Sequence, residues 1–381
     1  MRPLRIAGGT VLTEGGLSAG DILLRDGRID AAGDAAGGRT LDARGLLVLP
    51  GIVDMHGDAF ERQFQPRPGV GFPTDLALEE TERQLLASGV TTAFHGVTLS
   101  WEPGLRSAAA WRAMLDGLAA RAWTCDMRVH LRWEAYNLEA LDMAIADIAA
   151  GRVHLLAFND HTPAILRRMD DETKAAKYSE RAGMTLEDFR TIAAQVGARA
   201  GEVPAAQARI AAAARAAGLP MASHDDDTLE KRDGFRAAGA RICEFPVAEE
   251  VGRAAAAAGD FVAMGAPNVV RGGSHLGWAS AAVLAEAGVC NMLCSDYYYP
   301  CLLRAAFVLA GRGVLDLPRA WALVSANPAA ACGLADRGRI APGLRGDVLL
   351  VDAAGPAPRL VATIAGGVVA NLTAEGWARL S

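Results

Sequence analysis

The amino-acid sequence predicts an α/β protein: a (β/α)8 TIM-type barrel with a small β-sandwich that both chain termini build. Two observations carry this prediction. Through the middle of the 381-residue chain, apolar strand-like runs alternate with Ala- and Leu-rich helical runs, which is the pattern of repeated βαβ units. Both ends of the chain instead hold short alternating segments separated by glycine and aspartate turns, which is typical of short β-strands.

The terminal segments are expected to form one unit. The first 50 residues contain RIAGGTVLT, GDILLRDGRID and GRTLDARGLLVLP, and the last stretch contains GRIAPGLRGDVLLVD and RLVATIAGGVVANL. Each piece is too short to bury a core of its own. We therefore expect residues 1–50 and 336–381 to pair as the two halves of a small sandwich beside the middle domain, residues 51–335.

The middle of the chain supplies eight candidate strands, separated by helical stretches such as LDMAIADIAAG and AQARIAAAARAAG. Eight such units over this length favour a closed barrel over an open, doubly wound sheet. The candidate strands, in chain order, are LVLPGIVDMHGD, VTTAFHGV, MRVHLRWEAYN, VHLLAFNDHTP, LPMASHDDDT, ARICEFPVA, FVAMGAPNVV and VCNMLCSDYYYP.

One connection between the candidate strands is too long for a simple crossover. Residues 164–205 include LRRMDDETKAAKYSERAGMTLEDF, which is charged and has a helical composition. An excursion of this length beside a barrel mouth predicts a lid over the active site.

The composition excludes several classes of protein. A content of 51% hydrophobic and 22% charged residues is that of a globular protein with an ample core, and the formal net charge of −6 argues against a nucleic-acid surface. The six cysteines form no CxxC pair, and we find no signal peptide and no apolar run of membrane-spanning length. We expect a cytoplasmic protein without nucleic-acid or membrane partners, whose Ala-rich outer helices leave room for a homodimer.

Metal-ligating side chains gather at the expected strand ends. Position is informative here, because the active sites of barrels lie at the mouth where the C-terminal ends of the strands converge. His56 and Asp58 end the first strand two residues apart, so an imidazole and a carboxylate point the same way and can share a metal. Later strands add further candidates at their ends: Glu134, His161, His224, Glu244 and Asp296.

The pairing of histidines with carboxylates favours a metal over structural hydrogen bonding. His56, His161, His224 and His275 all fall at or just past a proposed strand end, beside acidic residues. Burying such a set without a metal would leave several charges uncompensated, which is costly. The sequence therefore predicts a metal centre at the barrel mouth.

The other histidines and the run of three aspartates have simpler interpretations. His130 and His154 lie early in their strands, where hydrogen bonding within the barrel is expected, while His95 stays open between a structural role and a ligand role. Residues 225–227 are all aspartate and cannot all be ligands. At least one of them is expected to cap the following helix, as aspartate does at a βα junction.

The ligand types predict the chemistry. Imidazoles combined with carboxylates suit Zn2+, Mn2+ or Fe2+ and exclude a thiolate-type structural zinc site. Two such ions about 3.5–4 Å apart generate hydroxide from a shared water near neutral pH. Asp296, at the end of the eighth strand, is placed to accept the proton of that water and pass it to the leaving group. We therefore expect a metal-dependent hydrolase that holds two divalent ions.

These residues also carry a family resemblance. The layout of LPGIVDMHGD, His224 on the fifth strand, CSD on the eighth and a split terminal sandwich resembles the amidohydrolase superfamily. Within it, the chain is most similar to the diphosphatases of phosphonate metabolism, which belong to the carbon–phosphorus lyase pathway. The matching stretches span essentially the whole chain, and they are HGDAFERQFQPRPGV, FNDHTP, ASHDDDT, EFP, GAPNVVRGGSH and SDYYYP.

The resemblance implies a reaction that releases pyrophosphate from a ribose 1-phosphonate 5-triphosphate, a small anionic substrate. Two positions depart from the wider superfamily: Asp58 replaces the second histidine of the usual His-x-His, and no lysine ends the fourth strand to act as a carboxylated bridge. Glu134 could replace that bridge. The leading ligand or catalytic candidates by resemblance are His56, Asp58, Glu134, His224 and Asp296, followed by His161 and then Glu244.

A triphosphate requires donors and positive charge near the metals. The segment RGGSH offers a glycine pair whose backbone N–H groups can form an anion nest, flanked by two donor side chains. The alternative is an ordinary tight turn, with the arginines paired to neighbouring acids. The candidate substrate-binding residues are Arg271, Gly272, Gly273, Ser274, His275, Asn268 and Arg67.

Two other functions stay open, because a fold does not fix a reaction. The first is hydrolysis of an amide, a cyclic amide or an amine of a small substrate, which is the commoner chemistry of the superfamily. The second is a non-enzymatic scaffold, against which the intact histidines and acids at the strand ends argue.

Overall fold

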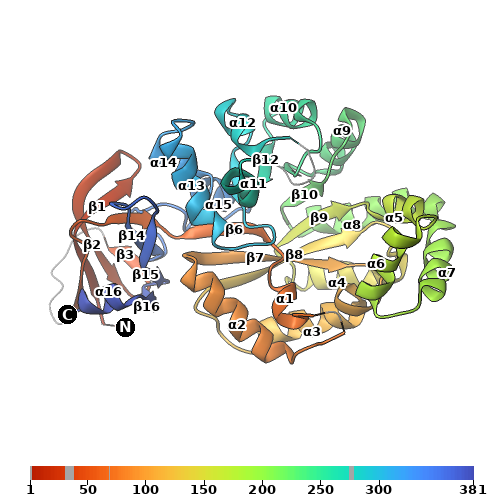
Figure 1. The fold of residues 1–381 in the computed structure, drawn as a ribbon, viewed down its shortest axis with the longest axis horizontal. Coiled ribbons are helices and arrows are strands. Elements are labelled where there is room, and N and C mark those ends of the chain that lie inside the picture. The colour runs from red at the N-terminus through yellow and green to blue at the C-terminus, as the bar shows by residue number, and fades with distance from the viewer. Residues whose placement is uncertain (1, 31–37, 68, 274–278) are drawn as a thin grey trace.

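The computed structural model describes residues 2–30, 38–67, 69–273 and 279–381. These residues form a barrel of parallel strands surrounded by helices and a second, separate sheet that both chain ends build (Figure 1). The second sheet and helices α5–α7 lie at opposite ends of the long axis of the molecule. The predicted barrel with a separate terminal sheet is confirmed.

The barrel contains eight parallel strands in sequence order, and each of the eight candidate strand segments holds one of them. The first and last strands approach each other through hydrogen bonds from Asp296 N to His56 O at 3.0 Å and from Asp58 N to Asp296 O at 2.8 Å. Barrel closure therefore takes place at the mouth. The strands are β6 (Ile52–Gly57), β7 (Val90–Leu99), β8 (Asp126–Glu134), β9 (Leu155–Asn159), β10 (Met221–His224), β11 (Ile242–Glu244), β12 (Phe261–Gly265) and β13 (Met292–Cys294).

Helices cover the outside of the barrel, and the longer ones bury one apolar face. In α8, for example, Val203, Ala206, Ile210 and Ala214 are buried, which is the three- and four-residue spacing of a helix face that packs on a sheet. The helices around the barrel are α1 (Glu61–Phe64), α2 (Thr74–Ala87), α3 (Ala108–Ala119), α4 (Leu141–Ala149), α8 (Val203–Ala216), α9 (Leu229–Ala238), α10 (Glu249–Ala257), α11 (Ala266–Arg271), α12 (Ala281–Glu286), α13 (Cys301–Gly311), α14 (Leu317–Ala322) and α15 (Ala326–Ala331).

The long excursion after β9 is helical, as its composition predicts. It contains α5 (Thr162–Arg168), α6 (Glu172–Ala182) and α7 (Leu186–Gly197), before the chain enters α8. These helices bury a small core of their own around Phe189. Trp101 Nε1 donates to Thr162 Oγ1 at 2.8 Å, and Arg181 pairs with Glu102, so the excursion is attached to the loop after β7. Its role as a lid stays a prediction.

The terminal sheet joins the two chain ends, with strand order β16-β15-β14-β5-β1-β2-β3 and β4 paired to β1. Aliphatic residues of its strands form a hydrophobic core that is separate from those of the barrel. The chain passes from this sheet into the barrel at Pro50–Gly51, where a side chain on Gly51 would lie 2.3 Å from Thr91 Oγ1. The strands are β1 (Leu4–Thr13), β2 (Gly16–Arg25), β3 (Arg28–Asp30), β4 (Arg39–Asp42), β5 (Leu47–Pro50), β14 (Val348–Asp352), β15 (Arg359–Ala365) and β16 (Val368–Leu372).

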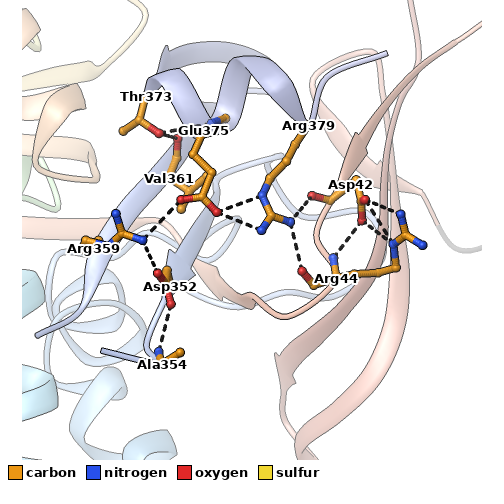
Figure 2. Close-up of polar contacts among 10 residues, drawn as sticks. Asp42, Arg44, Asp352, Ala354, Arg359, Val361, Thr373, Glu375 and Arg379 are labelled. Carbon is orange, nitrogen blue, oxygen red and sulfur yellow. Dashed lines mark hydrogen bonds and ion pairs between the residues drawn. The ribbon is translucent and has the colours of Figure 1, made fainter. Parts of the chain in front are cut away.

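A polar network at the last helix, α16 (Ala374–Ala378), ties the C-terminal end to the N-terminal strands (Figure 2). The Arg379 guanidinium donates to Glu375 Oε1 at 2.8 Å and to the carbonyl oxygens of Asp42 at 3.3 Å and Arg44 at 3.0 Å. Glu375 also pairs with Arg359 of β15. Arg379 therefore satisfies carbonyl groups of one chain end with a side chain of the other.

We expect Arg379→Ala to loosen this end of the terminal sheet. Losing hydrogen bonds from a charged donor costs about 1–2 kcal/mol, which corresponds to about 5–30-fold faster amide hydrogen exchange in α16. The control is Arg5→Ala, because Arg5 forms an exposed ion pair with Asp21 and its loss should leave exchange in α16 unchanged. Equal exchange rates in both variants would contradict the role given to Arg379.

All six cysteines are buried and free, in agreement with the absence of a disulfide framework. Within the described residues, no helix combines the length and the apolar character that crossing a membrane requires.

Candidate active site

The first group of candidate ligands lies at the centre of the barrel mouth. His56 ends β6, His224 ends β10 and Glu244 ends β11, and ligand atoms of the three lie within 4.8 Å of one another. His56 Nδ1 lies 3.3 Å from Glu244 Oε2, and His130 Nε2 lies 3.6 Å from Glu244 Oε1. Glu244, the last-ranked candidate from the sequence, therefore occupies the middle of the cluster, and His130 contacts it from β8.

A second group shares His224 with the first. It consists of His161, His224 and Asp225, again with ligand atoms within 4.8 Å of one another. Asp225 Oδ2 lies 3.2 Å from His224 Nδ1 and 3.5 Å from His161 Nε2. Asp225 is a site residue that the sequence left undecided among three aspartates.

The first cluster fits a divalent metal ion. Among the described residues, His56 Nδ1, both ring nitrogens of His130 and both carboxylate oxygens of Glu244 are buried without a hydrogen-bond partner. Buried polar groups normally have partners. Several unpartnered nitrogen and oxygen atoms gathered at one place therefore indicate a missing partner, which a metal ion would supply. Imidazole and carboxylate ligands suit zinc, manganese or iron.

Burial sets the protonation of these groups before any metal binds. It holds the pKa of His56 well below its usual range and lowers the pKa of His130 to about 3, while it raises the pKa of Glu244. Neutral imidazole is the form that binds a metal. The desolvated site therefore keeps its nitrogen ligands ready to coordinate.

Asp58, Asp296 and Arg132 complete the mouth. Arg132 Nη1 lies 3.6 Å from Asp58 Oδ2, and Arg132 Nη2 lies 3.3 Å from His224 Nε2. Burial raises the pKa of Asp58 to about 6 and that of Asp296 to about 7, and repulsion from Asp58 adds to the shift at Asp296. Arg132 lies two residues before Glu134 on β8, so both side chains point to the same face of the strand.

The backbone is strained where three strands end at the mouth. Asp225, Phe245 and Asp296 have φ values of 57°, 52° and 55°, which residues with a side chain rarely adopt. Each residue nevertheless donates its N–H to a neighbouring strand, to Glu244 O, Ala263 O and His56 O respectively. Such strain concentrates at functional sites. Here the strained residues Asp225 and Asp296 line the cavities at the mouth.

Glu134 lies at the end of β8, as expected, and its carboxylate faces the start of α5. Its oxygens accept from His161 N at 3.2 Å, Thr162 N at 3.1 Å and Thr162 Oγ1 at 2.7 Å. A carboxylate at a helix N-terminus is stabilised by the free N–H groups there. Glu134 thus holds the first turn of the excursion, and its role as a metal ligand stays a prediction.

Two cavities meet at the mouth and share Asp58, Arg132, His224 and Asp225 in their walls. The larger has a volume of about 1220 Å3 and extends beneath α5 and α6, where His161 lines it. The smaller, of about 280 Å3, lies against β11, β12 and α11, and His56 and Asp296 line it. The candidate metal ligands therefore lie where the two cavities join.

The structure separates the predicted substrate-binding residues. Arg271, Gly273 and Asn268 line the smaller cavity, whereas Arg67 is exposed and lines neither cavity. The N–H groups of Gly272 and Gly273 both donate to Asn268 O, at 3.1 and 2.9 Å. The anion nest predicted at these two amides is wrong, because they end α11 as a tight turn. Two further candidates, Ser274 and His275, lie outside the described residues.

Asp226 belongs to a buried ionic network behind β10. Its carboxylate lies 3.2 Å from Arg232 Nη1 and accepts from Ser223 Oγ, and Arg232 also lies 3.6 Å from Asp260. The expectation that an aspartate caps α9 is wrong, because Thr228 Oγ1 accepts from Lys231 N instead. Asp226 and Arg232 are both fully buried. A buried carboxylate without a cation would be strongly destabilising, so Asp226 pairs with Arg232 and does not cap the helix.

We expect Arg232→Met to lower the free energy of unfolding by about 3–5 kcal/mol, because the Asp226 carboxylate would stay buried without its ion-pair partner. Urea unfolding measures the change. Arg241→Met is the matched control, since Arg241 also contacts Asp260 but is two-thirds exposed, and its loss should cost less than about 1 kcal/mol. Similar costs for the two variants would show that the network does not stabilise β10.

Another residue missed from the sequence is Asp54, which closes the barrel beneath the site. It is fully buried on β6, and its carboxylate accepts from Ser295 N at 3.0 Å and from Ser295 Oγ. Burial raises the pKa of Asp54 to about 6. Only closure of the barrel brings these residues together, so no local sequence signal could have paired them.

Several known proteins are similar to this chain. The chain is 31% identical over 352 residues to the α-D-ribose 1-methylphosphonate 5-triphosphate diphosphatase of Escherichia coli K12, covering 89% of this chain and 93% of that protein. A shorter match, 36% identical over 100 residues, covers 26% of this chain and 20% of the allantoinase of Solibacter usitatus. No protein-family model matches the chain.

Solved structures share the fold. The dihydropyrimidinase of Brevibacillus agri superimposes with a TM-score of 0.61 at 14% identity, covering 96% of this chain and 94% of that one. A triazine hydrolase variant superimposes with a TM-score of 0.64 at 16% identity, covering 97% and 94%. These solved structures show the fold. The similarity to the diphosphatase along 89% of this chain shows that the chain is a hydrolase of the amidohydrolase superfamily and belongs to the family of the ribose 1-methylphosphonate 5-triphosphate diphosphatases.

Proposed function

We propose that this chain is a metal-dependent diphosphatase of phosphonate metabolism, which releases pyrophosphate from a ribose 1-phosphonate 5-triphosphate. The observation that carries the proposal is similarity along 89% of the chain to a protein named for that substrate. The position of the candidate ligands supports it, because they lie beside a large cavity lined with several arginines.

The residues proposed to hold the metal are those of the two clusters, with His224 shared between them. A divalent ion at these ligands supplies Lewis-acid chemistry, which lowers the pKa of water and offsets charge on phosphoryl oxygens. Zn2+, Mn2+ and Fe2+ all suit these ligands. We propose two ions, since two groups of candidate ligands meet at the mouth.

The protein's own side chains perform the remaining steps. Because burial and the nearby Asp58 raise the pKa of Asp296 to about 7, its carboxylate can accept a proton near neutral pH and return it. Arg132 holds a permanent positive charge between Asp58 and His224. It offsets the negative charge that gathers on the phosphoryl group when water attacks.

Hydrolysis of a C–N bond is the second candidate function. The shorter matches to an allantoinase, a dihydroorotase and a D-hydantoinase favour it, although each covers less than a third of this chain. The arginine-rich cavity favours the first function, because a triphosphate carries several negative charges for the arginines to offset, whereas a cyclic amide carries none or a single carboxylate.

A direct comparison of substrates tests the proposal. We expect kcat/KM of the metal-loaded protein for the ribose triphosphate to exceed that for allantoin, dihydroorotate or hydantoin by at least ~100-fold. Preference for a cyclic amide would replace the proposed reaction by C–N hydrolysis on the same metals.

The setting of the reaction belongs to the same proposal. We place the protein in the cytoplasm, because six buried free cysteines suit a reducing compartment. Assembly as a homodimer also stays a prediction, which sedimentation of the purified chain would check.

A further inference from the structure

The two cavities at the barrel mouth differ in charge. Besides the shared Arg132, the larger cavity is lined by five cationic side chains: Arg106, Arg167, Arg168, Arg181 and Lys231. Among the described lining residues of the smaller cavity, Arg271 is the one cation besides Arg132. A substrate with two unequal anionic ends would therefore meet two unequal sites.

Two of the five cations have no ion-pair partner among the described residues. Arg181 pairs with Glu102, Arg106 lies 3.9 Å from Glu102, and Lys231 lies 3.8 Å from Asp227. In contrast, Arg168 donates to the neutral Tyr178 hydroxyl at 2.7 Å. Neither Arg167 nor Arg168 forms an ion pair with any carboxylate of the described residues, and both project from α5 at the wall of the larger cavity. Their charge is available to an anion in that cavity.

The smaller cavity has a different character. Phe245, Met264 and Pro267 give it apolar walls, and Tyr297 lies at its edge with Arg271, whose Nη1 donates to the Tyr297 hydroxyl at 3.3 Å. Apolar walls with an aromatic ring suit the faces of a sugar. A single guanidinium beside them suits one phosphonate group.

We propose that the substrate lies across the junction of the cavities in one orientation. The β- and γ-phosphates enter the larger cavity toward Arg167 and Arg168, and the ribose with its 1-phosphonate enters the smaller cavity toward Arg271. The α-phosphorus is then at the junction, beside the candidate ligands and Arg132. This inference rests on the proposed function and adds to it the direction of the substrate and the exit of the product.

The orientation fixes what each fragment does in the reaction. The oxygen of water forms a bond to the α-phosphorus, and the bond from that phosphorus to the oxygen bridging it to the β-phosphorus breaks. The bridging oxygen keeps the electron pair and leaves as part of pyrophosphate, and the two protons of water are taken up by Asp296 and by the leaving group or solvent. Pyrophosphate is released beneath α5 and α6, whereas the ribose 5-phosphate product, still bearing its phosphonate, is held by Arg271.

Two sets of variants of the metal-loaded full chain test the orientation. Arg167→Ala with Arg168→Ala should weaken binding of inorganic pyrophosphate, measured by titration calorimetry, by at least about tenfold. Arg271→Ala should leave pyrophosphate binding unchanged. It should lower kcat/KM by about tenfold for the phosphonate-bearing triphosphate, but not for ribose 5-triphosphate without the phosphonate. The control is Arg209→Ala on α8, an exposed arginine that pairs with Asp142 outside both cavities.

The outcomes separate this inference from the proposed function. If the double variant binds pyrophosphate as the unchanged protein does, or if Arg271→Ala affects both triphosphates equally, the orientation is wrong even while pyrophosphate is released. If pyrophosphate binding weakens as expected but no triphosphate is cleaved, the larger cavity is a polyphosphate site and the proposed reaction is wrong.

Discussion

Asp296→Asn is expected to reduce turnover by at least ~100-fold while the bound metal remains, because an amide cannot accept the proton of the attacking water. Asp296 lines the smaller cavity and follows the strand that closes the barrel, with its N–H bound to His56 O at 3.0 Å. Asparagine keeps that backbone contact and nearly the same side-chain volume. The loss should therefore appear in kcat rather than in folding.

Turnover and metal content must be measured on the same sample, since Asp296 is also a candidate ligand. Asp233→Asn on α9 is the control, because this aspartate is exposed and should leave kcat unchanged. Turnover near that of the unchanged enzyme would remove Asp296 from proton transfer. A loss of metal that parallels the loss of turnover would instead make it a ligand.

His224→Ala is expected to remove most of the bound metal, and turnover with it. His224 is common to both groups of candidate ligands and lines both cavities. Groups that merely orient a metal ligand already contribute about 10–100-fold to metal affinity or activity, so loss of a direct ligand should cost at least ~100-fold. Metal analysis after dialysis gives the occupancy without relying on activity.

A histidine outside the site provides the comparison for His224. His154 precedes β9, and its Nδ1 accepts from Val129 N at 3.1 Å, as expected for a structural histidine. His154→Gln retains an acceptor and should keep full metal occupancy. Full occupancy in His224→Ala as well would mean that the ligand set is wrong.

The sequence was sufficient to predict the barrel, because each βα unit repeats the same local pattern. Each of the eight candidate strands can therefore be recognised without information about the others. It also placed His56 and His224 at strand ends, which the parallel topology brings together at the mouth. It ranked Glu244 last among the candidate ligands. Only closure of the barrel places that carboxylate 3.3 Å from His56.

The wrong predictions about the helix cap and the anion nest have one physical cause. The type of a residue does not reveal which hydrogen-bond or ion-pair partner its polar groups have in the folded chain. Three aspartates follow β10, and all suit a helix cap, but Asp226 pairs with the buried Arg232 and leaves the cap to Thr228. The glycine pair after α11 suits an anion nest, yet its amides are used by Asn268 O. In each case a contact within the folded chain competes with the predicted role.

The reaction itself can be observed by 31P NMR of the metal-loaded protein with ribose 1-methylphosphonate 5-triphosphate, beside a sample treated with a chelator. We expect pyrophosphate and a ribose 5-phosphate that retains its phosphonate, formed only when metal is present. Release of orthophosphate alone, or an unchanged triphosphate from protein with demonstrated metal occupancy, would contradict it.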